Sequence, residues 1–167
     1  MDLARATLET ELGIFVATYS EQGLAGLSFP SLKRSTGDRS AGTVALSATQ
    51  RRWHQLTSKA VRQTLSGKSS GELPPLDLRG GTAFQQSVWR QMLLIPSGAT
   101  ATYGEMARAL KKPGATRAVG SACGANPIPV LIPCHRVLAA GGRLGGFSSG
   151  LATKRQMLRR EDITWKE

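Results

Sequence analysis

The chain of 167 residues has 40% hydrophobic residues and a mean hydropathy of −0.19, a composition typical of one globular domain or two small ones. It holds no run of eighteen or more apolar residues, and its first residues lack the apolar stretch of a secretory signal, so we expect no membrane partner and no secretion. Its 22 Lys and Arg residues against 11 Asp and Glu residues leave a net charge of +11. This charge favours a protein that binds a polyanion, most commonly nucleic acid, over a basic protein that has no such partner.

Three runs near the start of the chain are typical of strands. Residues 4–12, 14–19 and 24–29 are rich in Thr, Leu, Ile, Phe and Val, and they are separated by Gly13 and by a turn at Gly23.

A polar loop and a helix follow. Residues 30–43 contain Ser, Gly, Arg and Asp and indicate a loop, whereas residues 48–65 place apolar side chains on one helical face. A stretch rich in Gly, Ser and Pro then predicts a boundary near residues 67–81. We therefore assign residues 1–79 to an N-terminal domain and residues 80–167 to a second domain.

The second half opens with helix signals. Thr82 with Gln85, and Thr102 with Glu105, have the spacing of capping boxes, in which side chains satisfy the free N–H groups of a helix start. Residues 116–124, rich in Ala, Gly and Ser, predict a further short helix. Two short helices joined by a tight turn have the shape of a helix-turn-helix.

The remainder of the chain predicts an extended segment, a loop and a helix. Residues 127–133 are apolar and interrupted by prolines, so they predict a buried extended segment, and the glycine-rich residues 140–146 predict a loop like a hairpin wing. Residues 151–160 predict a helix with two different faces. Leu151 and Leu158 should point inward. Lys154, Arg155 and Arg159 should point outward.

The positive charge is concentrated in this second half. Residues 80–167 hold twelve Lys and Arg against four Asp and Glu, a net +8, whereas residues 1–79 hold ten against seven, a net +3. The second half should therefore carry the surface that faces an anion.

Cys134 is the candidate nucleophile. A thiol attacks well only as a thiolate, and a neighbouring base or cation helps it to ionise; His135 and Arg136 follow it directly. The alternative is an inert core cysteine, but the Pro-Cys-His-Arg setting favours the nucleophile. Two cysteines cannot form a disulfide framework, so we expect a reducing, cytoplasmic location.

No metal or other cofactor is expected. Cys123, Cys134, His54 and His135 have no paired metal-ligand spacing, and the chain contains no glycine-rich phosphate loop for a nucleotide. Cys123 and His54 are expected to be structural.

Two residues have alternative roles. Asn126 could end a helix in the left-handed conformation or hydrogen-bond the chain beneath Cys134. Glu161 could offset the two arginines before it, or it could orient His135 as in a nucleophile–base–orienter triad.

Tyr103 and Arg117 stand at the starts of the two hairpin helices. In a helix-turn-helix the start of the second helix usually faces nucleic acid, so an exposed Arg117 there would contact phosphate.

The second half resembles the O6-alkylguanine-DNA alkyltransferases (methylated-DNA–protein-cysteine methyltransferases). The resemblance covers residues 82–161 and rests on these stretches: TAFQQSVW at 82–89, TYGE at 102–105, RAVG at 117–120, NP at 126–127, IPCHRV at 132–137, GFS at 146–148, and the helix with Lys154, Arg155, Leu158 and Glu161. It implies an α+β protein: an N-terminal strand-and-helix (ribonuclease H-like) domain followed by a mostly helical, winged helix-turn-helix-like domain.

The resemblance also implies direct repair of DNA. An alkyl group moves irreversibly from O6 of guanine, and from O4 of thymine, to Cys134, once per molecule, after the base is flipped out of the stack. It implies a monomer without a cofactor that binds double-stranded DNA through the minor groove with little sequence preference.

Roles for single residues follow from the same resemblance. His135 would act through water as the base, with Glu161 orienting it and Asn126 bracing the active-site turn. Tyr103 would donate to the guanine ring and crowd the backbone phosphate, and Arg117 would fill the place of the flipped base. The remaining candidates are Val137, Phe147, Ser148 and Lys154 for the substrate, with the Cys134 and Val137 carbonyls accepting from the guanine amino group, and Gly104, Lys112 and Arg143 for DNA.

One departure and two alternatives remain. Phe147 stands where many relatives have Tyr, so protonation of the leaving group would depend on Tyr103 or water. A non-catalytic winged-helix DNA-binding or lesion-sensing protein would give Cys134 no chemical role, and an unrelated thiol hydrolase would turn over repeatedly on a small substrate.

Overall fold

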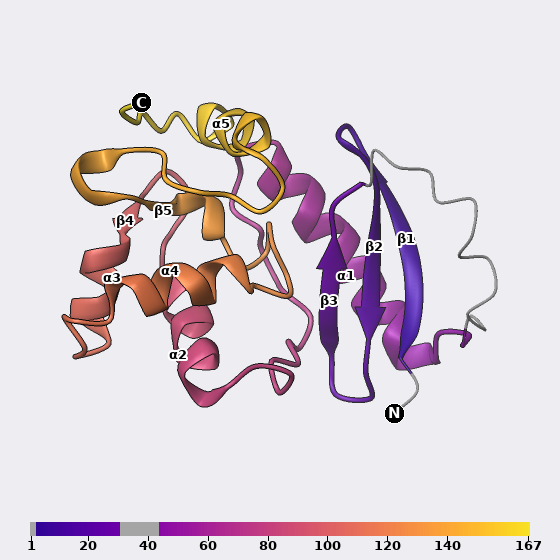
Figure 1. The fold of residues 1–167 in the computed structure, drawn as a ribbon. Coiled ribbons are helices and arrows are strands. Elements are labelled where there is room, and N and C mark those ends of the chain that lie inside the picture. The colour runs from indigo at the N-terminus through magenta and orange to yellow at the C-terminus, as the bar shows by residue number, and fades with distance from the viewer. Residues whose placement is uncertain (1–2, 31–43) are drawn as a thin grey trace.

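The N-terminal part is a small antiparallel sheet covered by one helix. The computed structural model describes residues 3–30 and 44–167. Strands β1 (Ala4–Thr10), β2 (Gly13–Tyr19) and β3 (Leu24–Ser28) pair in the order β1-β2-β3, and helix α1 (Ala48–Leu65) lies across one face of the sheet (Figure 1).

These elements confirm the strand and helix predictions. In β2, Phe15, Ala17 and Tyr19 are fully buried whereas Ile14 is 53% exposed, which is the alternation of a strand with one face on a core. Helix α1 has the predicted bounds. The predicted loop at residues 30–43 lies, beyond its first residue, outside the described part of the chain.

The C-terminal part is mostly helical. Its elements are α2 (Ala83–Met92), β4 (Ala101–Thr102), α3 (Tyr103–Ala109), α4 (Thr116–Gly124), the 3-10 turn η1 (Cys134–Arg136), β5 (Val137–Leu138), the 3-10 turn η2 (Ala140–Gly142) and α5 (Leu151–Arg160). Both predicted capping boxes are formed, at Thr82 and at Thr102. Helix α4 packs on α2 and α3, where the indole Nε1 of Trp89 donates to the carbonyl of Ala122 at 2.8 Å.

The two parts share a hydrophobic core. One cluster of buried side chains includes Phe15 and Leu27 of the sheet as well as Trp89 and Cys134 of the helical part. Strand β3 also bonds directly to the second half, since the Leu27 amide donates to the Pro127 carbonyl at 2.9 Å. The division into domains at residues 1–79 and 80–167 stays a prediction.

The prediction of an extended segment at residues 127–133 is wrong. The amide of Ile132 donates to the carbonyl of Ile128 at 2.9 Å, and Val130 has a φ of 75°, so the chain turns back on itself here. The prolines exclude a helix, as expected, but they are also compatible with a tight turn.

The predicted faces of α5 are wrong at two positions. Lys154 is fully buried, and Leu151 is 39% exposed, whereas Leu158 is buried as predicted. The Lys154 ammonium is stable inside because its Nζ donates to the carbonyls of Val137 at 2.8 Å and Gly146 at 3.2 Å. A buried charge that donates hydrogen bonds to nearby acceptors costs much less free energy than a buried charge without partners.

Within the described residues, no helix combines the length and the apolar character needed to cross a membrane.

The capping box at Thr82 offers a test of the local folding signals. We expect Thr82→Ala to lower the free energy of unfolding by about 1 kcal/mol, because the Gln85 amide loses its acceptor. Chemical denaturation measures this value. Thr49→Ala, an exposed substitution in the first turn of α1, should cause no such loss; equal losses in both variants would contradict a capping role.

Candidate active site

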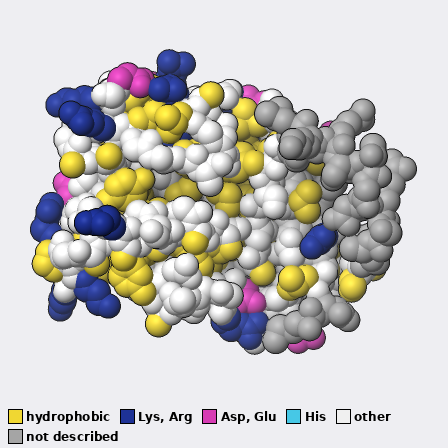
Figure 2. Space-filling model, viewed as in Figure 1, with side chains coloured by type: hydrophobic (Ala, Val, Ile, Leu, Met, Phe, Trp, Pro, Cys, Tyr) yellow, Lys and Arg dark blue, Asp and Glu magenta, His cyan; other side chains and the backbone are white. Residues whose placement is uncertain are grey.

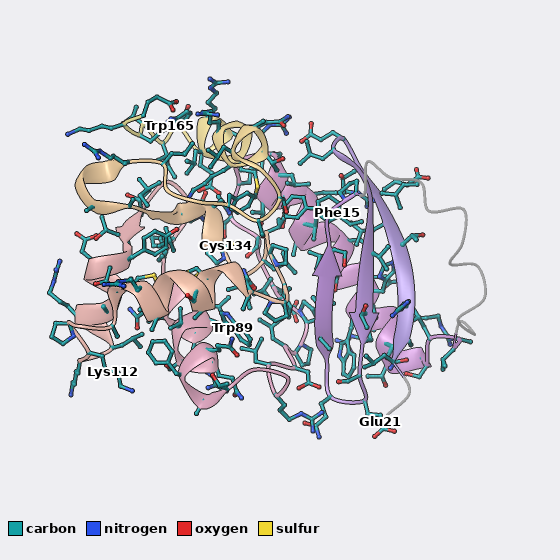
Figure 3. All side chains as sticks on the ribbon, viewed as in Figure 1. Phe15, Glu21, Trp89, Lys112, Cys134 and Trp165 are labelled. Atoms are coloured by element: carbon teal, nitrogen blue, oxygen red, sulfur yellow. The ribbon has the colours of Figure 1, made fainter. Side chains whose placement is uncertain are left out.

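Cys134 lies inside the C-terminal part, at the start of η1. Figure 3 shows it between α4 and β5, and its side chain is only 7% exposed. It lines a pocket of about 200 Å³ whose other lining residues are Tyr103, Gly120, Cys123, Gly124, Gly146, Phe147 and Ser148. Cys134 therefore faces a small chamber rather than open solvent.

Small residues of α4 keep this chamber open. A Cβ atom added at Gly120 or Gly124 would meet no other atom within 4 Å. The Ala- and Gly-rich sequence of the helix thus leaves room where α4 lines the pocket.

Asn126 supports the turn beneath the cysteine. Its Nδ2 donates to the carbonyl of Ile132 at 2.8 Å, and its Oδ1 accepts from the amide of Ile128 at 2.9 Å. Both bonds stay within the turn that leads to Cys134. Asn126 does not have the positive φ of a left-handed helix end, so the structure favours the bracing role.

His135 and Arg136 share one buried carboxylate. Nε2 of His135 lies 2.9 Å from Oε1 of Glu161, and the Arg136 guanidinium donates to both carboxylate oxygens, each at 2.8 Å. His135 is fully buried and Glu161 is 6% exposed. Glu161 therefore contacts His135, and Arg136 is engaged with Glu161, not placed as a cation for the thiol as its position in the sequence suggested.

The protonation states follow from burial and these partners. Burial acts to raise the pKa of Glu161, but hydrogen bonds from His135 and Arg136 outweigh it and bring the pKa to about 2. An ionised carboxylate can only accept, so Nε2 of His135 carries a proton. Burial lowers the pKa of His135 despite the nearby Glu161, and Nδ1 has no hydrogen-bond partner among the described residues. The imidazole is thus neutral, with Nδ1 free to accept a proton.

The resting thiol is protonated. Burial raises the pKa of Cys134, and a hydrogen bond with Asn126 and the charge of Lys154 oppose this only in part. Burial also lowers the pKa of Lys154 to about 8. A neutral thiol beside a mostly charged ammonium is poised to ionise when a base takes its proton.

Two aromatic residues form the walls of the pocket. Tyr103 is half-buried, and burial raises the pKa of its hydroxyl, so it is a proton donor at neutral pH. The Phe147 ring has the Lys154 ammonium 5.9 Å from its centroid, while Ser148 is exposed at the rim.

None of the predicted DNA-contacting residues lines the thiol pocket. Arg117, Lys112 and Arg143 are exposed, and Gly104 is half-buried in the first turn of α3. Lys112 extends over the Phe84 ring, 5.3 Å from its centroid. Figure 2 shows that many of the Lys and Arg side chains on this face gather over the helical part.

Two residues of the site were missed. Sequence position suggested a packing role for Cys123, which is buried but also lines the pocket, and nothing in the sequence marked Arg136 as the partner of Glu161. His54 is structural as predicted, because its ring nitrogens contact the Tyr19 hydroxyl at 2.9 Å and the Thr7 carbonyl at 3.1 Å. The described part of the chain holds no group of three His, Cys, Asp or Glu residues that could bind a metal.

Comparison with known proteins points to one family. Residues 83–163 match the model of the DNA-binding domain of 6-O-methylguanine DNA methyltransferase. The chain is 37% identical over 158 residues to a methylated-DNA–protein-cysteine methyltransferase of Methanosarcina barkeri, covering 93% of this chain and 94% of that protein. It is 50% identical over 108 residues to the enzyme of that name from Mycobacterium bovis, covering 62% of this chain and 64% of that one.

Solved structures agree with these sequence matches. A crystal structure of Mycobacterium tuberculosis OGT in complex with DNA superposes with a TM-score of 0.76 and 33% identity, covering 95% of this chain and 92% of that chain. The mixed α/β fold is therefore that of a known alkyltransferase structure. The chain spans between 29% and 64% of the length of several other curated relatives.

The buried Glu161 predicts a specific response to acid. Because its pKa falls from 4.5 in the unfolded chain to about 2 in the folded protein, its ionised form stabilises the fold above pH 4.5, and this contribution is lost as the pH falls toward 2. Glu161→Gln should be less stable than the wild type at pH 7, and the gap should narrow between pH 4.5 and 2. Denaturation curves across this range measure the gap; a gap that stays constant would contradict the assignment.

Proposed function

The chain belongs to the methylated-DNA–protein-cysteine methyltransferase family, and we propose that it repairs DNA directly by moving an alkyl group from O6 of guanine, or O4 of thymine, to Cys134. The observation that carries the proposal is a thiol at the floor of a small pocket, with a neutral His135 held by a buried carboxylate beside it. Because the target oxygen lies inside the base stack, the nucleotide must be flipped into this pocket.

The reaction is an in-line displacement at carbon. Nδ1 of His135 accepts the thiol proton through a water molecule, and the sulfur then attacks the alkyl carbon. The S–C bond forms as the C–O6 bond breaks, and guanine leaves with the bonding electrons and takes a proton from the Tyr103 hydroxyl or from water. The thioether at Cys134 is stable, so each molecule acts once.

Burial explains why a base is needed. With its pKa raised, the thiol is almost entirely protonated at neutral pH, and a positioned base lowers the cost of ionising it. Glu161 keeps the proton on Nε2 of His135 and so keeps Nδ1 free as the acceptor. The Lys154 charge favours the thiolate once it forms.

Lys154 acts on the substrate indirectly in this proposal. Its Nζ bridges the Val137 carbonyl and the Gly146 carbonyl, so it fixes the loop that carries Phe147 and Ser148. The Val137 carbonyl retains a second lone pair for the guanine amino group, and the Cys134 carbonyl offers a further acceptor.

The α3–α4 hairpin is proposed to dock in the minor groove. The exposed residues of α4 are Thr116, Arg117, Ala118, Ser121 and Gly124. All but Arg117 are small, which permits close approach of a backbone. Arg117 would enter the stack in place of the flipped base, a place that apolar wedges take in other minor-groove proteins. Minor-groove contacts read sequence poorly, which suits repair at any site, and Gly104, Lys112 and Arg143 would hold the flanking strands.

Finer features of the fold and its setting are also proposals. The three-stranded sheet with α1 supports a ribonuclease H-like N-terminal domain, and the α3–α4 hairpin with the loop at residues 139–143 supports a winged helix-turn-helix. We propose that the protein acts as a monomer in the cytoplasm, where its two free cysteines would stay reduced.

The transfer itself is directly testable. With DNA carrying labelled O6-methylguanine, we expect the label to move to the peptide that contains Cys134 and not to the one that contains Cys123, with at most one label per molecule. Cys134→Ser should abolish transfer while retaining binding, because a hydroxyl is a far weaker nucleophile. Bound lesion with no transfer by the wild type would indicate a lesion sensor, and repeated turnover on a small substrate would indicate a hydrolase.

The salt dependence of DNA binding separates the surface roles. The logarithm of the affinity should fall with the logarithm of the salt concentration, and each phosphate contact should make this slope steeper by about 0.9. Lys112→Ala and Arg143→Ala should therefore each make the slope less steep. Arg117→Ala should impair base extrusion, read from an unstacking-sensitive fluorescent base, more than it lowers the slope. Lys59→Ala, at an exposed position of α1, is the control and should change neither the slope nor base extrusion. An Arg117 variant that loses slope alone would indicate a plain phosphate contact.

A further inference from the structure

We propose that Phe29, directly after strand β3, is a positioning residue that holds the Phe147 wall of the thiol pocket and thereby sets which alkyl groups react efficiently. The inference rests on the proposed function and assigns a part in it to the N-terminal sheet.

Three aromatic rings connect the core of the sheet with the pocket. The Phe15 and Phe29 rings lie 5.0 Å apart between centroids with an interplanar angle of 45°, and the Phe29 and Phe147 rings lie 6.1 Å apart at 83°. Both distances fall in the range of favourable aromatic pairs, and the second pair is edge-to-face. Phe15 is fully buried, so the row begins at a fixed point and ends at a residue that lines the pocket.

The loop that carries Phe147 needs such support. It runs between Gly145 and Gly150, both with positive φ, and glycines leave a chain with more conformations to restrict. Gly146 and Ser148 on either side are exposed, while Phe147 is half-buried. Lys154 holds the loop from beneath, through the Gly146 carbonyl at 3.2 Å, and Phe29 packs against the Phe147 ring itself.

Strand β3 also bonds to the turn beneath the nucleophile. The Leu27 amide donates to the Pro127 carbonyl at 2.9 Å, and the neighbouring Asn126 braces the chain leading to Cys134. Two residues apart, Leu27 thus contacts the chain at Pro127, next to Asn126, and Phe29 contacts the Phe147 wall of the pocket. The end of β3 therefore contacts both the chain that leads to Cys134 and the ring of Phe147, and we infer that it helps to set the separation between them.

This separation matters most for the smallest substrate. A methyl group has little surface of its own, so its carbon is kept in line with the sulfur by the fit of the base between the walls. A larger alkyl group such as benzyl fills the space and makes its own contacts. Loss of the Phe29 ring should therefore slow methyl transfer more than benzyl transfer.

A double-mutant cycle tests the coupling. Single-turnover rates at saturating DNA are measured with O6-methylguanine and with O6-benzylguanine in the same duplex. Phe29→Ala should slow methyl transfer roughly two- to tenfold, the rate factor that corresponds to the energy of one aromatic pair. It should slow benzyl transfer less. In a Phe147→Ala background the same change should have little further effect, because the pair is already broken.

Leu27→Ala is the matched control. Leu27 is a buried residue of the same strand, so its loss weakens the core without removing a ring contact with Phe147. Leu27→Ala should change the transfer rate by the same factor with either alkyl group. In a Phe147→Ala background this factor should be unchanged, because the two residues act independently. Phe29→Ala should also speed hydrogen exchange at the Gly150 amide, which donates to the Phe147 carbonyl at 3.0 Å, more than Leu27→Ala does.

The outcomes separate this inference from the proposed function. If the wild type transfers methyl groups but Phe29→Ala and Leu27→Ala behave alike in rate ratio, coupling and exchange, the positioning role is overturned and the repair function stands. If the wild type transfers no alkyl group, the proposed function itself fails, and faster exchange at Gly150 in Phe29→Ala would then support only the structural contact.

Discussion

The carboxylate of Glu161 is the contact on which the site depends. It accepts two bonds from Arg136, one from His135 and a longer one, 3.3 Å, from the amide of Gly98. Arg136 in turn donates to the carbonyl of Ile95 at 2.8 Å. One buried charge thus joins the end of α5, the turn η1 and the chain after α2, three segments far apart in the sequence.

Two neighbouring residues contact Glu161 in different ways: Arg136 neutralises its charge, and His135 stays neutral beside it. A buried carboxylate is costly unless it is neutralised, and the bidentate guanidinium of Arg136 supplies that neutralisation. His135 therefore does not need to be protonated to keep Glu161 inside, and burial favours its neutral form. A base that stays neutral next to a carboxylate would be difficult to obtain without the arginine.

The sequence predicts this protein well where local rules decide. Capping boxes at Thr82 and Thr102 depend on residues three apart, and the first strands depend on short apolar runs that end at glycines, so both were found in the predicted places. The contact between Glu161 and His135 was one of two alternatives, because spacing along the chain cannot say which helix face packs behind η1.

The failures have a common cause. Lys154 was assigned to solvent by its charge, yet two backbone carbonyls, from Val137 and Gly146, make an interior position stable. Arg136 was assigned to the thiol by adjacency, yet its partner is 25 residues away. Polar residues are buried according to partners that only the tertiary fold supplies, so sequence patterns that rank residues by polarity miss those that build an active site from within.

The surface and the interior of the helical part have different roles in the proposed function. In that function, the net +8 of residues 80–167 acts over a distance and without regard to sequence, so it would concentrate DNA at the α3–α4 hairpin without choosing a base. The choice requires a chamber that admits one flipped base and a thiol that stays protonated until the base is in place. Burial of Cys134 provides both, since it shapes the pocket and raises the pKa of the thiol. A more exposed and more acidic cysteine would react faster with any electrophile in solution, and under the proposed single transfer per molecule it would be consumed before it met a lesion.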